Sequence, residues 1–480
     1  MVKKIFYSFL IISSTYFAQT PCNNGMAGEY PCNGYDLMAH IPVSILANTD
    51  GTPEGSDIWG WTDTTTNKEY AIAAMTNSTA FVDISDPLNP LFLGRLDSSA
   101  GNSFWRDVKI YNNHAFIVAD NVGAHGMQVF DLTKLRGVTT PQTFVVDKLY
   151  SDVSSCHNIV INETNGIAYL VDCKNTGRGI HFVDISDPIN PINLGNFNDE
   201  GTTHDAQVVT YKGPDTRYTD KEILIGSNET KVVILDVTDK NNIVKISSIN
   251  YTQLGYTHQG WFTVDQRYFI LGDETDEQNF GMNTRTLVFD FNDLENPILS
   301  STYSGPSSAI DHNGYVKGDE FFMASYRAGI RVLDITNIGS GNNTTSMTET
   351  GYFDTYPANN GTAFNGAWSI YPYFSSDNLI INDIERGLLI IRKSGTLSIG
   401  DETLEKNVSI SPNPMTTETN IRFLNNETIK SIKVYTVLGQ KIFEKNNINQ
   451  ARYVLTTNSF KKGIYIIKIN STITKKIVVK

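Results

Sequence analysis

Positive charge is scarce in this sequence of 480 residues. It holds 38 lysines and arginines against 51 aspartates and glutamates, which leaves a formal net charge of -13 at pH 7. Proteins that bind the phosphate backbone of nucleic acids need clustered lysine and arginine. The charge balance therefore argues against a nucleic-acid partner and favours a neutral, cationic or metal-bridged one.

Long apolar runs are also missing. No later stretch approaches the roughly 20 apolar residues that a membrane-spanning helix requires. The run from Ile5 to Phe17 is too short to span a bilayer, and Lys3 and Lys4 precede it. This pattern is typical of a secretory signal peptide, here residues 1–18 with cleavage after Ala18. We therefore expect an exported mature chain without a transmembrane segment.

Cysteine is rare, at four residues. In an exported chain an even number suggests pairing, and Cys22 with Cys32 is expected to close a small N-terminal loop. In an antiparallel hairpin, the residue numbers of any two facing residues add up to the same value. A turn at residues 163–166 therefore places Cys156 opposite Cys173. A metal pair is the less favoured alternative, because the CxxC spacing of zinc sites is absent.

The motifs of common enzymes are absent as well. The sequence has no Gly-x-Ser-x-Gly elbow, no His-Glu-x-x-His and no phosphate-cradling glycine loop. No catalytic nucleophile can be named from the sequence, so the catalytic residues are unknown at this point.

A repeated phrase is the strongest positive signal. Residues 81–90 read FVDISDPLNP and residues 182–191 read FVDISDPINP. Weaker copies of the phrase stand at residues 129–133, 234–238, 288–292 and 332–336. Copies of this kind are supersecondary units that must stack on their neighbours to bury a core.

Seven such units lie between Asp57 and Lys393, each with short β-branched or aromatic runs separated by turn residues. The strands expected in the third unit are residues 158–161, 167–171, 180–185 and 192–197. Histidines at the starts of successive units are 47, 54 and 54 residues apart, close to the length of a propeller blade. We predict a seven-bladed β-propeller, with residues 36–46 as a candidate outer strand of the last blade.

The composition changes after Lys393. Residues 394–406 are expected to form a polar linker, and residues 407–480 a small, lysine-rich Ig-like β-sandwich. Residues 433–442 and 463–469 are expected to be sandwich strands around a Leu-Gly turn. The whole chain is thus expected to be all-β, with an N-terminal segment at 19–56 and the propeller at 57–393.

Several phrases resemble the choice-of-anchor B family, whose propellers consist of LVIVD-type repeats. These phrases are DIWGWT at 57–62, HGMQVFD at 125–131, YTHQGW at 256–261, LGDETDEQNF at 271–280 and NGAW at 365–368. The resemblance covers about Cys22 to Arg392. It implies a propeller but no agreed activity.

The tail resembles the type A sorting domain of the type IX secretion system, with SPNP at 411–414 and KGIY at 462–465. That resemblance implies a bacterium of the Bacteroidota, the type IX secretion machinery as a partner, and a protein that is secreted or attached to the outer cell surface.

Four of the eight histidines occupy one register of the repeat. They are His157, His204, His258 and His312, and Arg106 holds the same register of the second unit. The residues that follow are acids or amides, namely Asp107, Asn158, Asp205, Gln259 and Asn313. The same rule for facing residues of a hairpin places Asp172 opposite His157. With a two-residue turn at 265–266, it also places Asp273 opposite His258.

Two interpretations of this register compete. In the structural one, each histidine bonds an acid or amide and holds the ring together. In the functional one, several line a central funnel and bind a divalent cation or an anionic ligand, and mixed nitrogen and carboxylate ligands favour a transition metal over calcium. The ligand-binding candidates are Arg106, Asp107, His157, His204, Asp205, His258, Gln259, Asp311 and His312. The metal candidates are His204, His258, Asp273 and His312.

We therefore expect a secreted or cell-surface binding or scaffold protein for an unassigned extracellular ligand, with a divalent metal ion as a candidate cofactor. The alternative is a metal-dependent hydrolase or lyase that uses the same funnel, with a metal-bound water as nucleophile. A third interpretation, a passive adhesion protein acting through its outer faces, predicts no metal at all.

Overall fold

The computed structural model describes residues 19–339, 347–395, 408–423, 428–436, 441–457, 460–470 and 473–480. The expected signal peptide at 1–18 and residues 396–406 of the expected linker lie outside the described residues. The chain divides into two compact units, Met1–Gly395 and Thr396–Lys480.

Strands of the first unit form seven sheets within the described residues. The first sheet contains β4 (Gly55–Asp63), β5 (Lys68–Met75), β6 (Ser78–Asp83), β7 (Leu91–Asp97) and β11 (Gln142–Phe144). The second contains β8 (Arg106–Tyr111), β9 (His114–Ala119), β10 (Met127–Asp131) and β12 (Lys148–Tyr150). The third contains β13 (Asn158–Asn162), β14 (Ile167–Val171), β15 (Ile180–Asp184) and β16 (Ile192–Phe197).

The remaining four sheets follow in chain order. The fourth contains β17 (Asp205–Thr210), β18 (Glu222–Ser227), β19 (Val232–Asp236) and β20 (Val244–Ile249). The fifth contains β21 (Thr257–Phe262), β22 (Tyr268–Asp273), β23 (Arg285–Asp290) and β24 (Ile298–Ser304). The sixth contains β25 (Gly314–Lys317), β26 (Glu320–Ala324), β27 (Ile330–Asp334), β28 (Thr348–Phe353), β2 (Tyr30–Asn33) and β1 (Met26–Ala27). The seventh contains β29 (Ala367–Tyr371), β30 (Asn378–Asp383), β31 (Gly387–Lys393) and β3 (Tyr35–Ile41).

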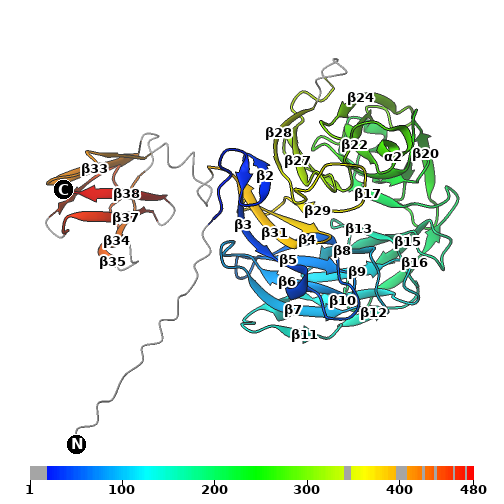
Figure 1. The fold of residues 1–480 in the computed structure, drawn as a ribbon, viewed down its shortest axis with the longest axis horizontal. Helices are drawn as coiled ribbons and strands as arrows, with labels where there is room; N and C mark the ends of the chain where they lie inside the picture. Colours follow the sequence, from blue (N-terminus) through cyan, green and yellow to red (C-terminus); the bar gives the residue numbers. More distant parts are fainter. Residues whose placement is uncertain are drawn as a thin grey trace, which may run out of the picture. The chain divides into compact units, whose positions relative to one another are not determined.

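The first strands of consecutive sheets lie next to one another. The neighbouring pairs are β4 and β8, β8 and β13, β13 and β17, β17 and β21, β21 and β25, β25 and β29, and β29 and β4. The succession therefore returns to its start, and Figure 1 shows β4, β8, β13, β17 and β29 toward the middle and β7, β12, β16, β20 and β24 at the periphery. The unit is all-β, with many four-stranded antiparallel sheets, which is consistent with a propeller.

A strand from the start of the chain completes the seventh sheet. β3 pairs antiparallel with β31, from Tyr35 opposite Lys393 to Ile41 opposite Leu388. The sequence placed this outer strand at residues 36–46, but the strand ends at Ile41 and the short helix α1 (Val43–Leu46) follows. Pro42 lies between them, and proline cannot donate to a strand ladder.

The apolar core lies between neighbouring sheets. Phe81 of the first sheet stacks on Phe130 of the second with ring centroids 4.7 Å apart, and both side chains are fully buried. Phe182 of the third sheet and Leu224 of the fourth sheet belong to another buried apolar cluster. Because the sheets are covered on both faces, second strands such as β9 and β14 read as near-continuous apolar runs.

The repeated aspartate has a local structural cause. Asp83 Oδ1 accepts a hydrogen bond from the backbone N–H of Ser85 at 3.0 Å, and Asp184 accepts one from Ser186 at 2.8 Å. The same bond to the second following residue occurs at Asp131, Asp236, Asp290 and Asp334. Each of these aspartates therefore ends the third strand of its sheet with a side-chain turn.

The hairpin register expected in the third sheet is confirmed. β13 pairs with β14 from Asn158 opposite Val171 to Asn162 opposite Ile167. Cys156 and Cys173 are joined by a disulfide, as expected from that register, and so are Cys22 and Cys32.

The second unit contains two sheets within its described residues. One has β32 (Val408–Ser411), β33 (Glu418–Phe423) and β36 (Arg452–Thr456), and the other has β35 (Lys441–Lys445), β34 (Ile432–Thr436), β37 (Gly463–Ile469) and β38 (Ile473–Val479). Both contribute to one core, with Ile421 and Leu455 from the first and Val434 and Ile467 from the second. The expected strand residues 433–436 and 441–442 belong to β34 and β35. The expected Leu-Gly turn falls within residues 437–440, which lie outside the described residues.

The helical segments of the described chain are short. Besides α1 they are α2 (Asp276–Phe280) and the 3-10 turns η1 (Leu132–Leu135) and η2 (Thr216–Tyr218). None of these described helices has the length and apolar character needed to cross a membrane.

Candidate functional site

The four histidines gather where the inner strands begin. Ring centroids are 4.2 Å apart for His157 and His204, 4.7 Å for His204 and His258, and 4.4 Å for His258 and His312. They line a small cavity together with Asp57, Trp105, Arg106, Asp107, Asn158, Asp205, Asn313 and Trp368. We call this cavity the histidine funnel.

The Nδ1 atoms of two funnel histidines contact backbone carbonyls of the next sheet. His312 Nδ1 donates to the carbonyl of Trp368 at 2.6 Å, and His204 Nδ1 donates to that of His258 at 3.4 Å. A carbonyl only accepts, so Nδ1 carries the proton in both rings. Burial lowers the pKa of His312 to about 4 and that of His204 well below its usual value. Both rings are therefore neutral at pH 7, with a lone pair on Nε2.

Glu274 stands in front of two of these rings. Its Oε1 is 3.6 Å from Nε2 of His312 and its Oε2 is 3.8 Å from Nε2 of His258, and both distances are too long for hydrogen bonds. Tyr326 donates its hydroxyl to Oε1 at 2.8 Å. Burial raises the pKa of Glu274 to about 7. Ligand atoms of His258, Glu274 and His312 all lie within 4.8 Å of one another, which is a spacing that one metal ion can bridge.

A second group of the same size consists of Asp120, His157 and Asp172. Here His157 Nδ1 is 3.2 Å from Asp120 Oδ2. Lys174 lies 3.2 Å from Asp120 and 3.1 Å from Asp172, and Arg178 lies 2.6 Å from Asp172. These carboxylates are thus neutralised by the protein itself. The sequence-derived proximity of His157 and Asp172 holds, but Asp172 pairs with Arg178.

A buried charge cluster closes the base of the funnel. Lys109 Nζ lies 3.1 Å from Asp57 Oδ2 and 2.5 Å from Asp107 Oδ1, and the N–H of Ile159 donates to Asp107 Oδ2 at 2.8 Å. Burial lowers the pKa of Lys109, but the two carboxylates outweigh it and raise that pKa. The cluster links the first, second and third sheets, and the carboxylate of Asp205 continues it by accepting from Asn158 at 2.8 Å.

Two predicted ligand-binding residues act mainly as links between sheets. Gln259 exchanges hydrogen bonds of 3.2 and 2.9 Å with the backbone of Gly314 and so joins the fifth and sixth sheets. Arg106 lines the funnel, yet its Nη1 contacts Ser98 at 2.9 Å and His125 at 3.2 Å. Burial lowers the pKa of Arg106 to about 10.

Asp311 lies outside the funnel. Its Oδ2 accepts from the Thr286 hydroxyl at 3.1 Å, and burial together with the charges of Glu277 and Asp276 raises its pKa well above the usual value. Asp311 therefore belongs to a separate buried acidic cluster beside α2.

The expected pairing of His258 with Asp273 is wrong. A bulge between Thr257 and Gln259 sets Asp273 opposite Thr257, because a bulge adds one residue to one strand. Asp273 accepts from the backbone N–H groups of Gly255 and Tyr256 at 2.8 and 2.6 Å and does not line the funnel. Its neighbour Glu274 takes the place beside His258.

Sequence analysis did not single out Glu274, Asp120 or Lys109. Glu274 stands within an acidic run at residues 273–277, and nothing in that run distinguishes Glu274 from its acidic neighbours. Asp120 follows β9 and Lys109 lies two residues after Asp107 on the same strand face. Each of them has at least one partner in another sheet, namely His312 for Glu274, His157 for Asp120 and Asp57 for Lys109, and no local spacing identifies these partners.

A wider opening of about 300 Å³ adjoins the funnel. It shares Trp105, His157 and His204 with the funnel, and Glu274 also lines it. The basic side chains of Lys174 and Arg178 line the same opening. Asp120 and Asp172, which pair with these cations, line it too, so a ligand in this space would lie next to Glu274 and against a wall of paired charges.

Comparisons with solved structures give distant likenesses. A functionally unknown protein from Desulfotomaculum acetoxidans is 14% identical, with 64% of this chain and 87% of that one covered and a TM-score of 0.45. Hydrazine synthase of Kuenenia stuttgartiensis is 11% identical, with 68% and 92% covered and a TM-score of 0.49. A Lactobacillus plantarum protein is 11% identical, with 84% and 100% covered and a TM-score of 0.46. At these values the likenesses carry no argument about function.

The comparison with curated proteins gives no match. Residues 409–480 match the family described as a secretion system C-terminal sorting domain, which agrees with the type IX sorting domain expected from the tail. The matched domain indicates handling by the type IX machinery and a protein that is secreted or attached to the outer surface. The C-terminal segment of this chain is therefore a type IX sorting domain.

Proposed function

We propose that the protein is an extracellular metal-binding β-propeller whose site is the histidine funnel. In this proposal the seven sheets over residues 57–393 are seven blades of the LVIVD type, as in the choice-of-anchor B family. Residues 19–56 close the ring, residues 394–406 are a linker, and the Ig-like sandwich at 407–480 directs export. The bound metal serves a binding or scaffold role toward an extracellular ligand.

The group of His258, Glu274 and His312 carries the proposal. Two neutral imidazoles direct Nε2 toward one carboxylate at 3.6 and 3.8 Å without a hydrogen bond between them. A lone pair and a carboxylate that face each other across such a gap leave a position that suits a cation. Among the described lysines and arginines, none forms an ion pair with Glu274.

The surroundings of the rings support the same conclusion. Histidine ligands of metals commonly donate their other ring N–H to a backbone carbonyl, which sets the tautomer and the ring orientation. His312 makes this bond to Trp368, whereas Nδ1 of His258 is buried and has no partner among the described residues. At His312 the structural and functional interpretations are therefore compatible, because Nδ1 links two sheets while Nε2 faces Glu274. Two nitrogens and one carboxylate favour zinc or another divalent transition metal over calcium.

Elemental analysis of the full chain tests the proposal. The protein and the double variant His258→Ala/His312→Ala are dialysed against zinc and then against buffer, and circular dichroism checks the fold. We expect one equivalent of metal in the parent and none in the folded double variant. His114→Ala, which alters a histidine of β9 away from the funnel, is the matched control and should retain the metal. The proposal is contradicted if the parent protein binds no zinc, cobalt or iron. The histidines would then serve only as links between sheets.

The second candidate is a metal-dependent hydrolase or lyase that uses the same funnel. The opening of about 300 Å³ beside Glu274 favours it, because it leaves room for a substrate next to the proposed metal ligands. A metal ion with an open coordination position activates water as a nucleophile. Zinc-loaded protein would be assayed with p-nitrophenyl phosphate and p-nitrophenyl acetate. Turnover that disappears in Glu274→Gln supports this candidate, and the absence of turnover in metal-loaded protein removes it.

A further inference from the structure

A second cavity lies at the other end of the same inner strands. The funnel is lined by their first residues, such as Asp57 and Asp107, whereas this cavity is lined by later ones, such as Trp59 and Lys109. Its volume is about 380 Å³, within the range of roughly 300 to 1,000 Å³ that is typical of small-molecule sites. We call it the aromatic pocket, and its lining residues include Trp59, Lys109, Glu163, Gln207, Trp261, Tyr371 and Tyr373.

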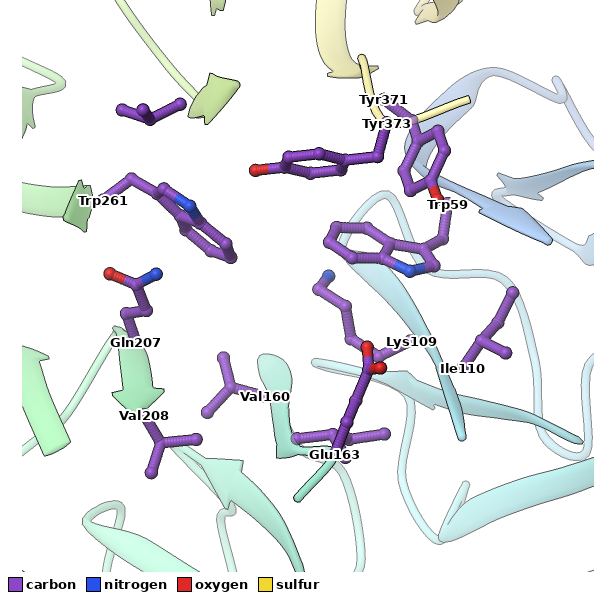
Figure 2. Close-up of a pocket in the computed structure, with 12 residues that line it drawn as sticks. Trp59, Lys109, Ile110, Val160, Glu163, Gln207, Val208, Trp261, Tyr371 and Tyr373 are labelled. Carbon is purple, nitrogen blue, oxygen red and sulfur yellow. The ribbon is translucent and has the colours of Figure 1, made fainter. Parts of the chain in front are cut away.

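Aromatic rings form its walls. Figure 2 shows Trp59 and Trp261 on opposite sides of the space, with Tyr373 between them along one side. Trp59 packs edge to face on Tyr371 with centroids 5.1 Å apart, and Trp261 packs on Tyr315 at 5.0 Å. The rings support one another, so their orientations are set before any ligand arrives.

Polar groups at the pocket retain unused hydrogen-bonding capacity. Gln207 Oε1 accepts from the N–H of Phe262 at 2.7 Å, which sets the amide orientation. Figure 2 shows the amide of Gln207 at the edge of the space, and its Nε2 has no acceptor among the described residues. The hydroxyl O–H of Tyr373 is buried and likewise has no acceptor within the described chain. Glu163 is exposed at the pocket and supplies a carboxylate acceptor.

The charges of the pocket exclude several classes of ligand. The ammonium of Lys109 lies 4.7 Å from the ring centroid of Trp59 and so occupies one of the aromatic faces on which a cationic ligand could pack. Asp57 and Asp107 neutralise Lys109, and Glu163 adds a negative charge, so an anion gains no net attraction. A purely apolar ligand would leave the donors of Gln207 and Tyr373 unpaired, which costs free energy in a buried site.

A neutral molecule with an apolar face and a polar rim meets all of these conditions. A hexose ring has this character, since its C–H bonds form faces that pack on aromatic rings while its hydroxyls donate and accept at the edge. We propose that the aromatic pocket binds a neutral hexose unit of an extracellular saccharide chain. In the bound state the sugar ring packs against Trp261, accepts from Gln207 and Tyr373, and donates to Glu163. This second site is independent of the metal in the funnel.

Fluorescence titration of the full chain with cellotetraose, laminaritetraose and mannotetraose tests the proposal. We expect at least one of these tetrasaccharides, at millimolar concentration, to change the tryptophan fluorescence with saturation. Trp261→Ala should weaken that binding by about tenfold or more, as measured by calorimetry. Tyr373→Phe, which removes a single hydroxyl and preserves the ring packing, should weaken it by about three- to tenfold.

Phe280→Ala is the matched control, because it removes an exposed aromatic ring at the end of α2, outside both cavities. It should leave the sugar affinity unchanged, and so should a chelator that empties the funnel. The proposal is overturned if none of the three tetrasaccharides binds, if choline chloride binds in their place, or if binding is the same in Trp261→Ala and Tyr373→Phe as in the parent. Because the readout does not depend on metal, it separates this proposal from the one for the funnel.

Discussion

Nε2 of His312 lies 3.6 Å from Oε1 of Glu274, while Nδ1 of the same ring donates to the carbonyl of Trp368 at 2.6 Å. One side of the imidazole therefore links the sixth sheet to the seventh, and the other side faces a carboxylate across a gap too long for a hydrogen bond. His258 faces Glu274 across a similar gap, at 3.8 Å, and these two gaps are the basis of the proposed metal site.

Replacing Glu274 by glutamine should weaken metal binding. The substitution preserves the size of the side chain but removes the only carboxylate of the proposed ligand group, so we expect the affinity for Co²⁺ to fall by about tenfold or more. The visible absorption of the bound cobalt measures it. Asp273→Asn is the matched control, because Asp273 accepts backbone hydrogen bonds outside the funnel. It should lower stability without changing cobalt affinity, and an equal loss of affinity in both variants would contradict the assignment of Glu274.

Lys109→Met should destabilise the first unit strongly. The change leaves Asp57 and Asp107 buried without their cation, which typically costs about 3 to 5 kcal/mol of unfolding free energy. Tryptophan fluorescence in urea measures it, because all five tryptophans of the chain lie in this unit. Lys212→Met removes an exposed pair with Asp220, with side chains 62% and 68% exposed, and should cost less than about 1 kcal/mol. Equal effects of the two variants would show that the buried cluster does not hold the sheets together.

Glu277 should make the fold sensitive to alkaline pH. Burial, and then the charge of Asp276, raises the pKa of Glu277 to about 9, against 4.5 for an ordinary glutamate. Between these values the native state binds more protons than the unfolded state, so the unfolding free energy falls as pH rises. Glu277→Gln removes this contribution. Its melting temperature should therefore decline less than that of the parent between pH 6 and pH 9, and parallel curves would contradict the prediction.

Removing the Cys156–Cys173 disulfide should destabilise the third sheet. The bond closes a loop with a sequence separation of 17, and its loss through Cys156→Ser/Cys173→Ser should cost about 3 kcal/mol in the loop-entropy picture. Urea unfolding of the double variant measures the loss. Val264→Ala, at an exposed side chain, is a neutral control. If the urea midpoint of the double variant equals that of the parent protein, the packing around Cys156 stabilises the third sheet without the disulfide.

Local sequence predicted features whose partners lie in the same hairpin or turn. The repeated aspartate predicts a turn because its carboxylate reaches the backbone two residues later, as at Asp83 and Asp184. The register of β13 with β14, and with it the Cys156–Cys173 bond, follows from the position of one turn. The same reasoning failed at His258, because nothing in the alternation of β21 reveals the bulge beside Thr257.

The sequence by itself determined the all-β character, the repeat and the common register of the four histidines, since these depend on short-range periodicity and turn chemistry. Only the tertiary structure decided that Glu274 and not Asp273 faces His258, that Lys109 is held between Asp57 and Asp107, and that Trp59 and Trp261 enclose a second cavity. Asp57 and Lys109 come from different sheets, and so do Trp59 and Trp261. Their proximity arises when the first strands of all seven sheets come together, a condition that no single strand or hairpin encodes.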